Sequence, residues 1–342
     1  MSTHASLRWL LPLALFGSAC HPGPLRAPVE GRVVVSPAVS LFYWVYGSGP
    51  DTAVVIHGGP GLSQDYLVPA LSGLLPGRTL IFYDQRGRGR STVADTLALS
   101  PDSDVADLEA VRRRFGLARL TLIGHHWGAA IAGLYAMQHP EHVARILMIS
   151  PFVVHPSFAY EFALLGPRGT NGSGAVAAYR AIATPAAAAA FCRRYGWWYF
   201  LPTPADSPPV SPRLREELCD VPDDGLRRGE AVKRALLRSL GSWSWRLGLN
   251  QVRAPVLVVE GHGPAVVEGA ARRWAEHLPN ARVLLLPGPY LYPWADDARP
   301  LDTAADEFLS GRWPAGSVEP PPFTATAQSA PAGAPSRAQS TP

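Results

Sequence analysis

Three short stretches of the sequence carry residue types that can do chemistry, and each follows an apolar run. They are HGGPG (57–61), DQRGRGRS (84–91) and GHHWG (124–128). The preceding runs, TAVVIH, TLIFYD and LTLIG, are continuous and apolar, which is typical of central parallel strands covered on both faces. Because ligands of open parallel sheets bind beyond the carboxyl ends of the strands, we expect the three stretches to converge on one site.

The order and spacing of these stretches resemble the α/β-hydrolase fold family, and specifically its proline iminopeptidase-like branch, over about residues 31–313. The resemblance implies an α/β fold with a mostly parallel sheet flanked by helices. It also implies that GHHWG is the sharp turn that presents a nucleophile, with an oxyanion hole built by backbone N–H groups of Trp127 and Gly59. His57 and His125 would then have structural roles, holding the turns in place.

All three positions of the family's catalytic triad are substituted in this chain. His126 stands where the family has a serine or, in some members, an aspartate. The acid of the family's G-x-x-D pattern corresponds to Pro264, and the base of its G-x-G-H pattern corresponds to Leu291. Beyond residue 262 the only histidine in the sequence is His277, at a predicted helix end, so no histidine is available for the base position. We therefore predict a protein without hydrolytic activity, a pseudo-enzyme that binds a small apolar or peptide-like ligand.

Two other functions stay open at this point. His126 could act with Glu260 as an acid–base pair in a lyase or isomerase. Alternatively, an active peptidase or esterase could use a relocated triad. Glu260 and His262 could also ligate zinc, but their spacing matches no established metal motif. We therefore expect no metal and no cofactor.

The charged stretch DQRGRGRS invites a structural interpretation. Asp84, Arg86 and Arg90 lie in a loop that follows a predicted strand. In this fold such a loop usually joins strand to helix by ion pairs beside the site, so we expect a structural role rather than contact with a substrate.

The elements that must position these motifs alternate between strand and helix. Helices are predicted from Pro101 to Phe115 and from Trp127 to His139, each between strand-like runs. Residues 152–250 break this alternation and read as a mostly helical cap or lid. The predicted core therefore comprises residues 31–151 and 251–313, in which the later elements are strands at 254–261 and 281–288 and a helix near 301–311.

The two ends of the chain read differently from the core. Residues 1–20 contain a short apolar run typical of a signal peptide, so we expect export to the periplasm or a membrane. The sequence before Cys20 resembles a lipobox, and lipidation of Cys20 or ordinary cleavage both stay open. Residues 21–30 read as a linker, and residues 314–342 as a disordered Pro/Ala-rich tail.

Composition and cysteine content limit the partners. Charged residues make up 17% of the chain, below the roughly 25% of typical soluble domains, and no basic cluster is interleaved with aromatic residues. We therefore expect a packed globular protein that does not bind nucleic acid.

In an exported protein, Cys192 and Cys219 could form a disulfide, although two buried thiols remain the alternative.

Overall fold

The computed structural model describes residues 25–155, 183–200, 212–219, 225–262, 270–289 and 291–320. Cys20 and Pro264 lie outside these ranges. The strands are β1 (Val29–Ser36), β2 (Val39–Gly47), β3 (Asp51–Ile56), β4 (Arg78–Tyr83), β5 (Leu120–His125), β6 (Val143–Ile149), β7 (Val256–His262) and β8 (Ala281–Pro287). The α-helices are α1 (Leu67–Ala70), α2 (Pro101–Arg114), α3 (Trp127–Gln138), α6 (Pro185–Phe200), α7 (Pro212–Cys219), α8 (Gly225–Leu240), α9 (Ala270–Ala275) and α10 (Arg299–Leu309). Short 3₁₀ helices include η1 (Ser72–Leu74), η2 (Thr96–Ala98), η3 (Pro140–His142) and η5 (Arg246–Gln251).

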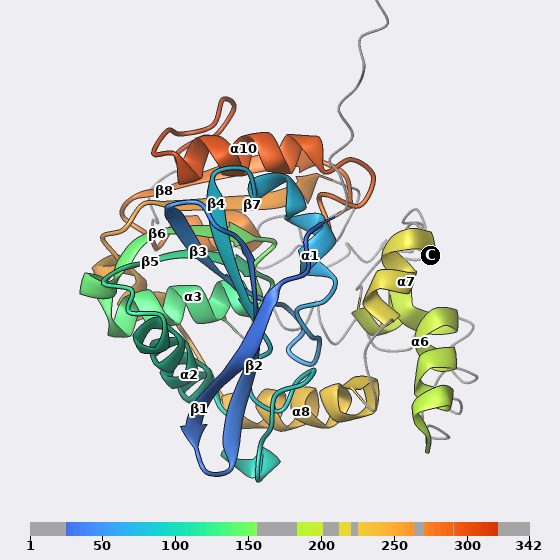
Figure 1. Cartoon of the computed structure of the whole chain (residues 1–342). Helices are drawn as coiled ribbons and strands as arrows, with labels where there is room; N and C mark the ends of the chain where they lie inside the picture. The colour runs from blue at the N-terminus through green and yellow to red at the C-terminus, as the bar shows by residue number, and fades with distance from the viewer. Residues whose placement is uncertain are drawn as a thin grey trace, which may run out of the picture.

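The strands form one eight-stranded sheet in the order β1-β2-β4-β3-β5-β6-β7-β8 (Figure 1). β1, β2 and β4 pair antiparallel, and every later pairing is parallel. The predicted α/β fold with a mostly parallel sheet is therefore confirmed. The motif-bearing strands β3, β4 and β5 are neighbours, so the three loops that follow them leave the same edge of the sheet.

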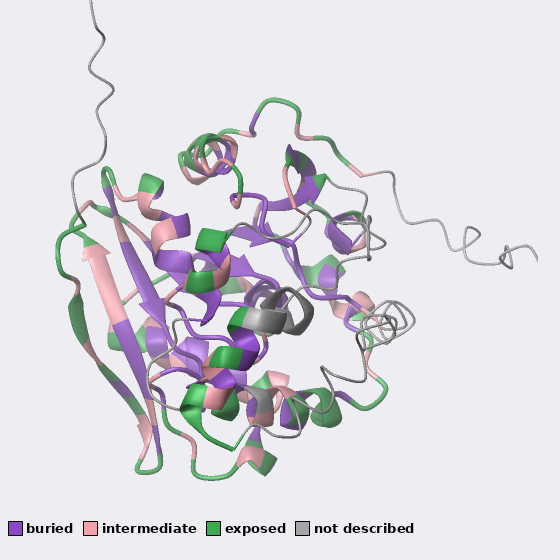
Figure 2. Ribbon diagram, turned by 90° about the vertical axis from the view of Figure 1, so that its right-hand side faces the viewer, coloured by how far each residue is buried: buried purple, intermediate pink, exposed green. Residues whose placement is uncertain are grey.

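Helices cover both faces of the sheet (Figure 1). α2, α3 and α9 contribute to one hydrophobic core, and α1 and α10 contribute to the other. The central strands are consequently buried on both faces: neighbouring residues Val54 and Val55 of β3 face opposite cores, yet both are almost fully buried. Figure 2 shows this burial concentrated in the middle of the sheet, whereas the edge strand β1 is partly exposed.

α2 illustrates how local sequence sets an element that the site uses. Ser100 caps the helix in a reciprocal capping box with Ser103, and Pro101 occupies the first turn. Gly116 follows the helix with a φ of 62°, a left-handed conformation that favours glycine. These signals place Asp104 and Asp107 on the buried side of α2, next to the charged loop.

The described part of residues 152–250 is mostly helical, comprising α6, α7, α8 and η5. α6 packs against both α7 and α8. A disulfide between Cys192 of α6 and Cys219 of α7 joins the first two of these helices. Among the described residues, no helix is both long and apolar enough to cross a membrane.

Two predicted boundaries were wrong. The linker was expected to run to residue 30, but β1 begins at Val29, because Val29 and Glu30 pair with β2. The tail was expected to be disordered from residue 314, but residues 314–320 are among those that the structure describes. Val318 forms an antiparallel bridge with Val283 at the edge of β8, where free backbone groups are open to pairing.

Candidate functional site

The GHHWG stretch forms a sharp turn between β5 and α3. His126 sits in this turn with φ 48° and ψ −108°, a strained conformation for a residue with a side chain. Cβ atoms added to the flanking glycines would lie 2.6 Å from Ala129 Cα at Gly124 and 2.1 Å from the Ile56 carbonyl oxygen at Gly128. The backbones thus approach as closely as a nucleophile turn requires, and the unusual residue is only the central one.

His126 is held by the end of the neighbouring strand. Its N–H donates to the carbonyl of Ile149 over 2.9 Å, and its own carbonyl accepts from Phe152 over 3.0 Å. The imidazole lies edge-on to the Phe152 ring at 5.4 Å between centroids. Burial lowers the pKa of His126 to about 4, opposed by a hydrogen bond from the ring to the Gly59 backbone. At neutral pH the ring is therefore uncharged.

The side chain of His57 holds the HGGPG turn through hydrogen bonds. The Gln85 N–H donates to His57 Nε2 over 3.1 Å, so Nε2 accepts and the ring proton sits on Nδ1, which donates to the Gly58 carbonyl over 2.9 Å. Burial lowers the pKa of His57 to about 3. Through these bonds the ring links the HGGPG turn to the start of the charged loop.

His125 connects the three loops around the site. Its Nε2 lies 2.7 Å from the Leu291 carbonyl, which can only accept, so Nε2 carries the proton. Nδ1 must then accept, and it does so from the Tyr66 hydroxyl over 2.6 Å; that hydroxyl in turn accepts from the Gly58 N–H over 2.8 Å. Burial, assisted by neighbouring His126, lowers the pKa of His125 to about 3. Both ring nitrogens are thereby used for structure.

The charged loop at residues 84–91 forms the ion pairs that the sequence led us to expect. Arg86 binds Asp107 through two hydrogen bonds of 2.7 and 2.5 Å. Arg90 binds Asp65 in the same two-pronged way, at 3.0 and 2.8 Å. Asp84 accepts from the N–H groups of Gln64 and Arg90, both over 2.9 Å. Burial raises the pKa of Asp84 to about 7.

A buried carboxylate on α2 connects this loop to the GHHWG turn at residues 124–128, hereafter the elbow. Asp104 accepts from Arg88 at 2.7 and 2.9 Å and from the Trp127 indole N–H at 2.9 Å. Arg88 also donates to the carbonyl of Pro60 in the HGGPG turn over 2.8 Å. All three motif loops therefore meet in one network.

The remaining predicted site residues are distributed as follows. Leu291 is buried beyond β8, and its carbonyl reaches the elbow through His125. Glu260 is buried near the carboxyl end of β7, whereas His262 is exposed. Pro264, which the resemblance predicts at the family's acid position, falls outside the described residues. No cluster of three or more histidine, cysteine or acidic residues within the described part of the chain could hold a metal ion.

Sequence reasoning missed four residues that bear on the site. Tyr66 and Asp104 act only through long-range bonds, and no local pattern marks them. Trp245 contacts both Phe152 and Trp127, bringing the end of the cap to the elbow. Ser150, directly after β6, shares with His126 a positive φ in a residue other than glycine, and this strain is not visible in the sequence.

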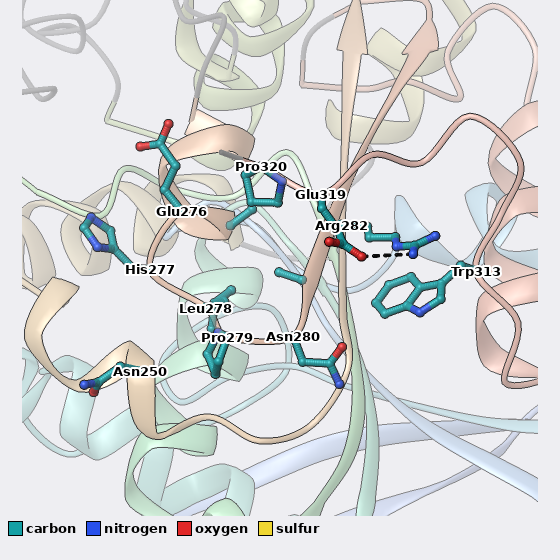
Figure 3. Close-up of a pocket in the computed structure, with 12 residues that line it drawn as sticks. Asn250, Glu276, His277, Leu278, Pro279, Asn280, Arg282, Trp313, Glu319 and Pro320 are labelled. Carbon is teal, nitrogen blue, oxygen red and sulfur yellow. Dashed lines mark hydrogen bonds and ion pairs between the residues drawn. The ribbon is translucent and has the colours of Figure 1, made fainter. Parts of the chain in front are cut away.

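A hollow lies away from the elbow, at the amino end of β8. It has a volume of about 510 Å³. Figure 3 shows its polar side chains pointing in different directions, with Glu276 and His277 on one side and Trp313 on the other. Arg282 is already engaged by Glu319 at 3.1 Å. The arrangement offers no convergent set of reactive groups.

Comparison with known proteins agrees with this geometry. The family model described as alpha/beta hydrolase fold matches residues 53–290. A proline iminopeptidase of Saccharolobus solfataricus is 35% identical over 117 residues, covering 33% of this chain and 37% of the relative. One from Heyndrickxia coagulans is 34% identical over 129 residues, covering 37% of this chain and 44% of the relative. The chain thus matches less than half the length of these curated relatives.

Solved structures extend the likeness in fold to most of the chain. The proline iminopeptidase of Mycobacterium smegmatis superposes with a TM-score of 0.60 over 82% of this chain and 98% of that chain, at 22% identity. The esterase RhEst1 from Rhodococcus sp. ECU1013 gives 0.63 over 84% and 99%, at 20% identity. From the family match, the motif geometry and these relatives, we conclude that the chain belongs to the α/β-hydrolase fold family, in its proline iminopeptidase-like branch.

Proposed function

We propose that this protein binds a small apolar or peptide-like ligand at the elbow without hydrolysing it. The proposal rests on the backbone conformation and the charge of His126. Its backbone has the strained conformation of the nucleophile position, but its uncharged ring hydrogen-bonds to Gly59, in the turn that the family uses for its oxyanion hole. A group in this position offers neither a hydroxyl nor a carboxylate for attack.

The base position supports the same proposal. Serine hydrolysis needs a histidine that takes the proton of the nucleophile. Leu291, at the family's base position, has an aliphatic side chain, and the nearby His125 already uses both ring nitrogens. An elbow without a nucleophile and a base position without a titratable group leave binding as the function that the fold can still serve.

The chemistry around the elbow favours an uncharged ligand. His57, His125 and His126 are all neutral at pH 7, because burial lowers each pKa to 4 or below. Phe152 lies between His126 and the cap residue Trp243, with ring centroids 5.4 and 6.2 Å apart, respectively. Aromatic rings and neutral imidazoles suit apolar or peptide-like groups better than charged ones.

The test uses the purified full chain with p-nitrophenyl acetate, proline 2-naphthylamide and a fluorophosphonate label. We expect hydrolysis at the rate of buffer alone, no labelled serine, and a retained small molecule in native mass spectrometry. A proline iminopeptidase with an intact triad serves as the positive control. Turnover abolished by the serine-directed label would overturn the proposal.

One observation favours a second candidate, a hydrolase with a relocated nucleophile. Ser150 is buried at the end of β6 with a φ of 44°, and its N–H donates to the Val259 carbonyl over 2.7 Å. Ser150 and His126 follow neighbouring strands, so a serine and a histidine emerge side by side from the sheet. In this case the label would appear on Ser150 and vanish in Ser150→Ala, but persist in the control Ser63→Ala.

We also propose that the protein is exported. The support is the signal-like start of the chain together with the Cys192–Cys219 disulfide, a bond that persists in oxidising compartments. Alkylation of intact cells followed by reduction should release two thiols per chain. If Cys20 is lipidated, Cys20→Ala should move the protein from the membrane fraction to the soluble fraction. Alkylation of Cys192 and Cys219 without reduction would contradict export.

A further inference from the structure

The cap helix α8 makes backbone contact with the HGGPG turn. A Cβ added to Gly229 of α8 would lie 1.9 Å from the Gly61 carbonyl oxygen, and a Cβ added to Gly61 would lie 2.2 Å from the Gly229 carbonyl oxygen. The obstructing atoms are backbone in both directions, so no side chain can rotate away. Only glycine at both positions allows this approach.

The same helix also contacts the charged loop at residues 84–91. Arg228, next to Gly229, donates to the Gly89 carbonyl over 2.7 Å. One turn further along, Val232 lies against Gly87: a Cβ there would be 3.1 Å from Val232 Cγ2. α8 thus holds two of the three motif loops, in addition to packing on η2 and α6 (Figure 1).

This contact lies next to the backbone group that faces His126. Gly61 is two residues from Gly59, and Gly59 receives the hydrogen bond of the His126 ring. A displacement of α8 would therefore be passed to the group that faces His126 through a turn of three residues. Glycine is a poor helix former, so a glycine within α8 is explained by this contact and not by helix stability.

We propose that α8 is a latch: its docking through Gly229 and Arg228 holds the HGGPG turn against His126, and its release opens the site. The idea that release of α8 admits a ligand rests on the function proposed above. The docking of α8 does not depend on that function. Gly229 and Arg228 are thus positioning residues that act on the site through Gly61 and Gly89.

The test compares Gly229→Ala with Ser239→Ala by hydrogen–deuterium exchange of the full chain without ligand. Both changes improve the helix-forming tendency of α8, but Ser239 is exposed, and its hydroxyl donates to the Leu236 carbonyl within the same helix. We expect amides of residues 58–64 and 87–91 to exchange at least about tenfold faster in Gly229→Ala and within about twofold of the parent in Ser239→Ala, with β5 unchanged in both.

Arg228→Ala keeps the result interpretable if Gly229→Ala does not fold. It should accelerate exchange mainly in residues 87–91, because it removes the hydrogen bond to the Gly89 carbonyl. In stopped flow, 1-anilinonaphthalene-8-sulfonate should associate faster with the variant that releases α8. Unchanged or slower exchange of residues 58–64 in folded Gly229→Ala, together with unchanged exchange of 87–91 in Arg228→Ala, would overturn the latch. Faster exchange without dye binding would instead count against the proposed ligand site.

Discussion

Tyr66 donates its hydroxyl proton to Nδ1 of His125 over 2.6 Å, and this bond joins the loop after β3 to the end of β5. The same hydroxyl accepts from Gly58, and the far side of the imidazole donates to Leu291. One tyrosine and one histidine therefore set the relative positions of the HGGPG turn, the elbow and the loop that carries Leu291. These two side chains thus fix the arrangement of the loops around His126.

Tyr66→Phe should destabilise the protein by about 1–3 kcal/mol, because it leaves two buried polar groups without a partner. Tyr83→Phe is the matched control: this tyrosine is also fully buried, but its hydroxyl has no hydrogen-bond partner among the described residues. Urea unfolding should show a loss for the first and a neutral or stabilising effect for the second. Equal losses would contradict the network.

Arg88→Met should cost about 3–5 kcal/mol, because it leaves the Asp104 carboxylate buried without its cation. Arg113→Met breaks a pair with Glu109 in which the arginine is 73% exposed, so it should cost less than about 1 kcal/mol. Thermal or urea unfolding of the two variants measures the difference. Similar costs would show that burial of the Asp104 pair does not matter.

Acid should destabilise the protein relative to a His126→Asn variant. The folded pKa of His126 is about 4, below its unfolded value near 6.5, so the unfolded chain binds more protons between these values. Stability due to the neutral ring is thus fully present above pH 6.5 and is lost as the pH falls toward 4, by up to about 1.4 kcal/mol per pH unit.

The difference between parent and variant isolates this effect. Asp84 and Asp302, whose pKa values are raised to about 7 and about 6, shift the total stability in the opposite direction, but they are present in both proteins. Urea titrations at several pH values should give a parent-minus-variant stability that declines from pH 6.5 to 4. A flat difference would mean that the ring is not buried in its neutral form.

Restoring the triad should restore chemistry if the scaffold is intact. We expect the triple variant His126→Ser, Pro264→Asp and Leu291→His to hydrolyse p-nitrophenyl acetate at least about tenfold faster than a control with His126→Ala and the same two other changes. The fluorophosphonate label should attach at position 126 in the first protein only. Equal rates in both would indicate that the elbow no longer presents its side chain productively.

Much of the fold was predictable because it depends on local patterns. Continuous apolar runs predicted the buried strands, and Pro101 and Gly116 marked the limits of α2 within a residue or two. The glycines around His126 predicted a sharp turn, since close backbone approach tolerates no side chain there. The ends of the core were less predictable: the start of β1 depends on pairing with β2, and the bridge at Val318 depends on pairing with Val283 of β8.

The sequence alone predicted the strands and the elbow, because residue type and spacing along the chain are enough to define them. Through the family resemblance it also predicted substituted triad positions at residues 126, 264 and 291. Tertiary structure alone decided that Tyr66 and Leu291 share His125, that Asp104 holds the loops together, and that α8 rests on Gly61. These contacts join residues far apart in the chain, and they arise only when packing brings those segments within a few ångströms. Hydrogen bonds and steric fit act at that range, where sequence spacing carries no information.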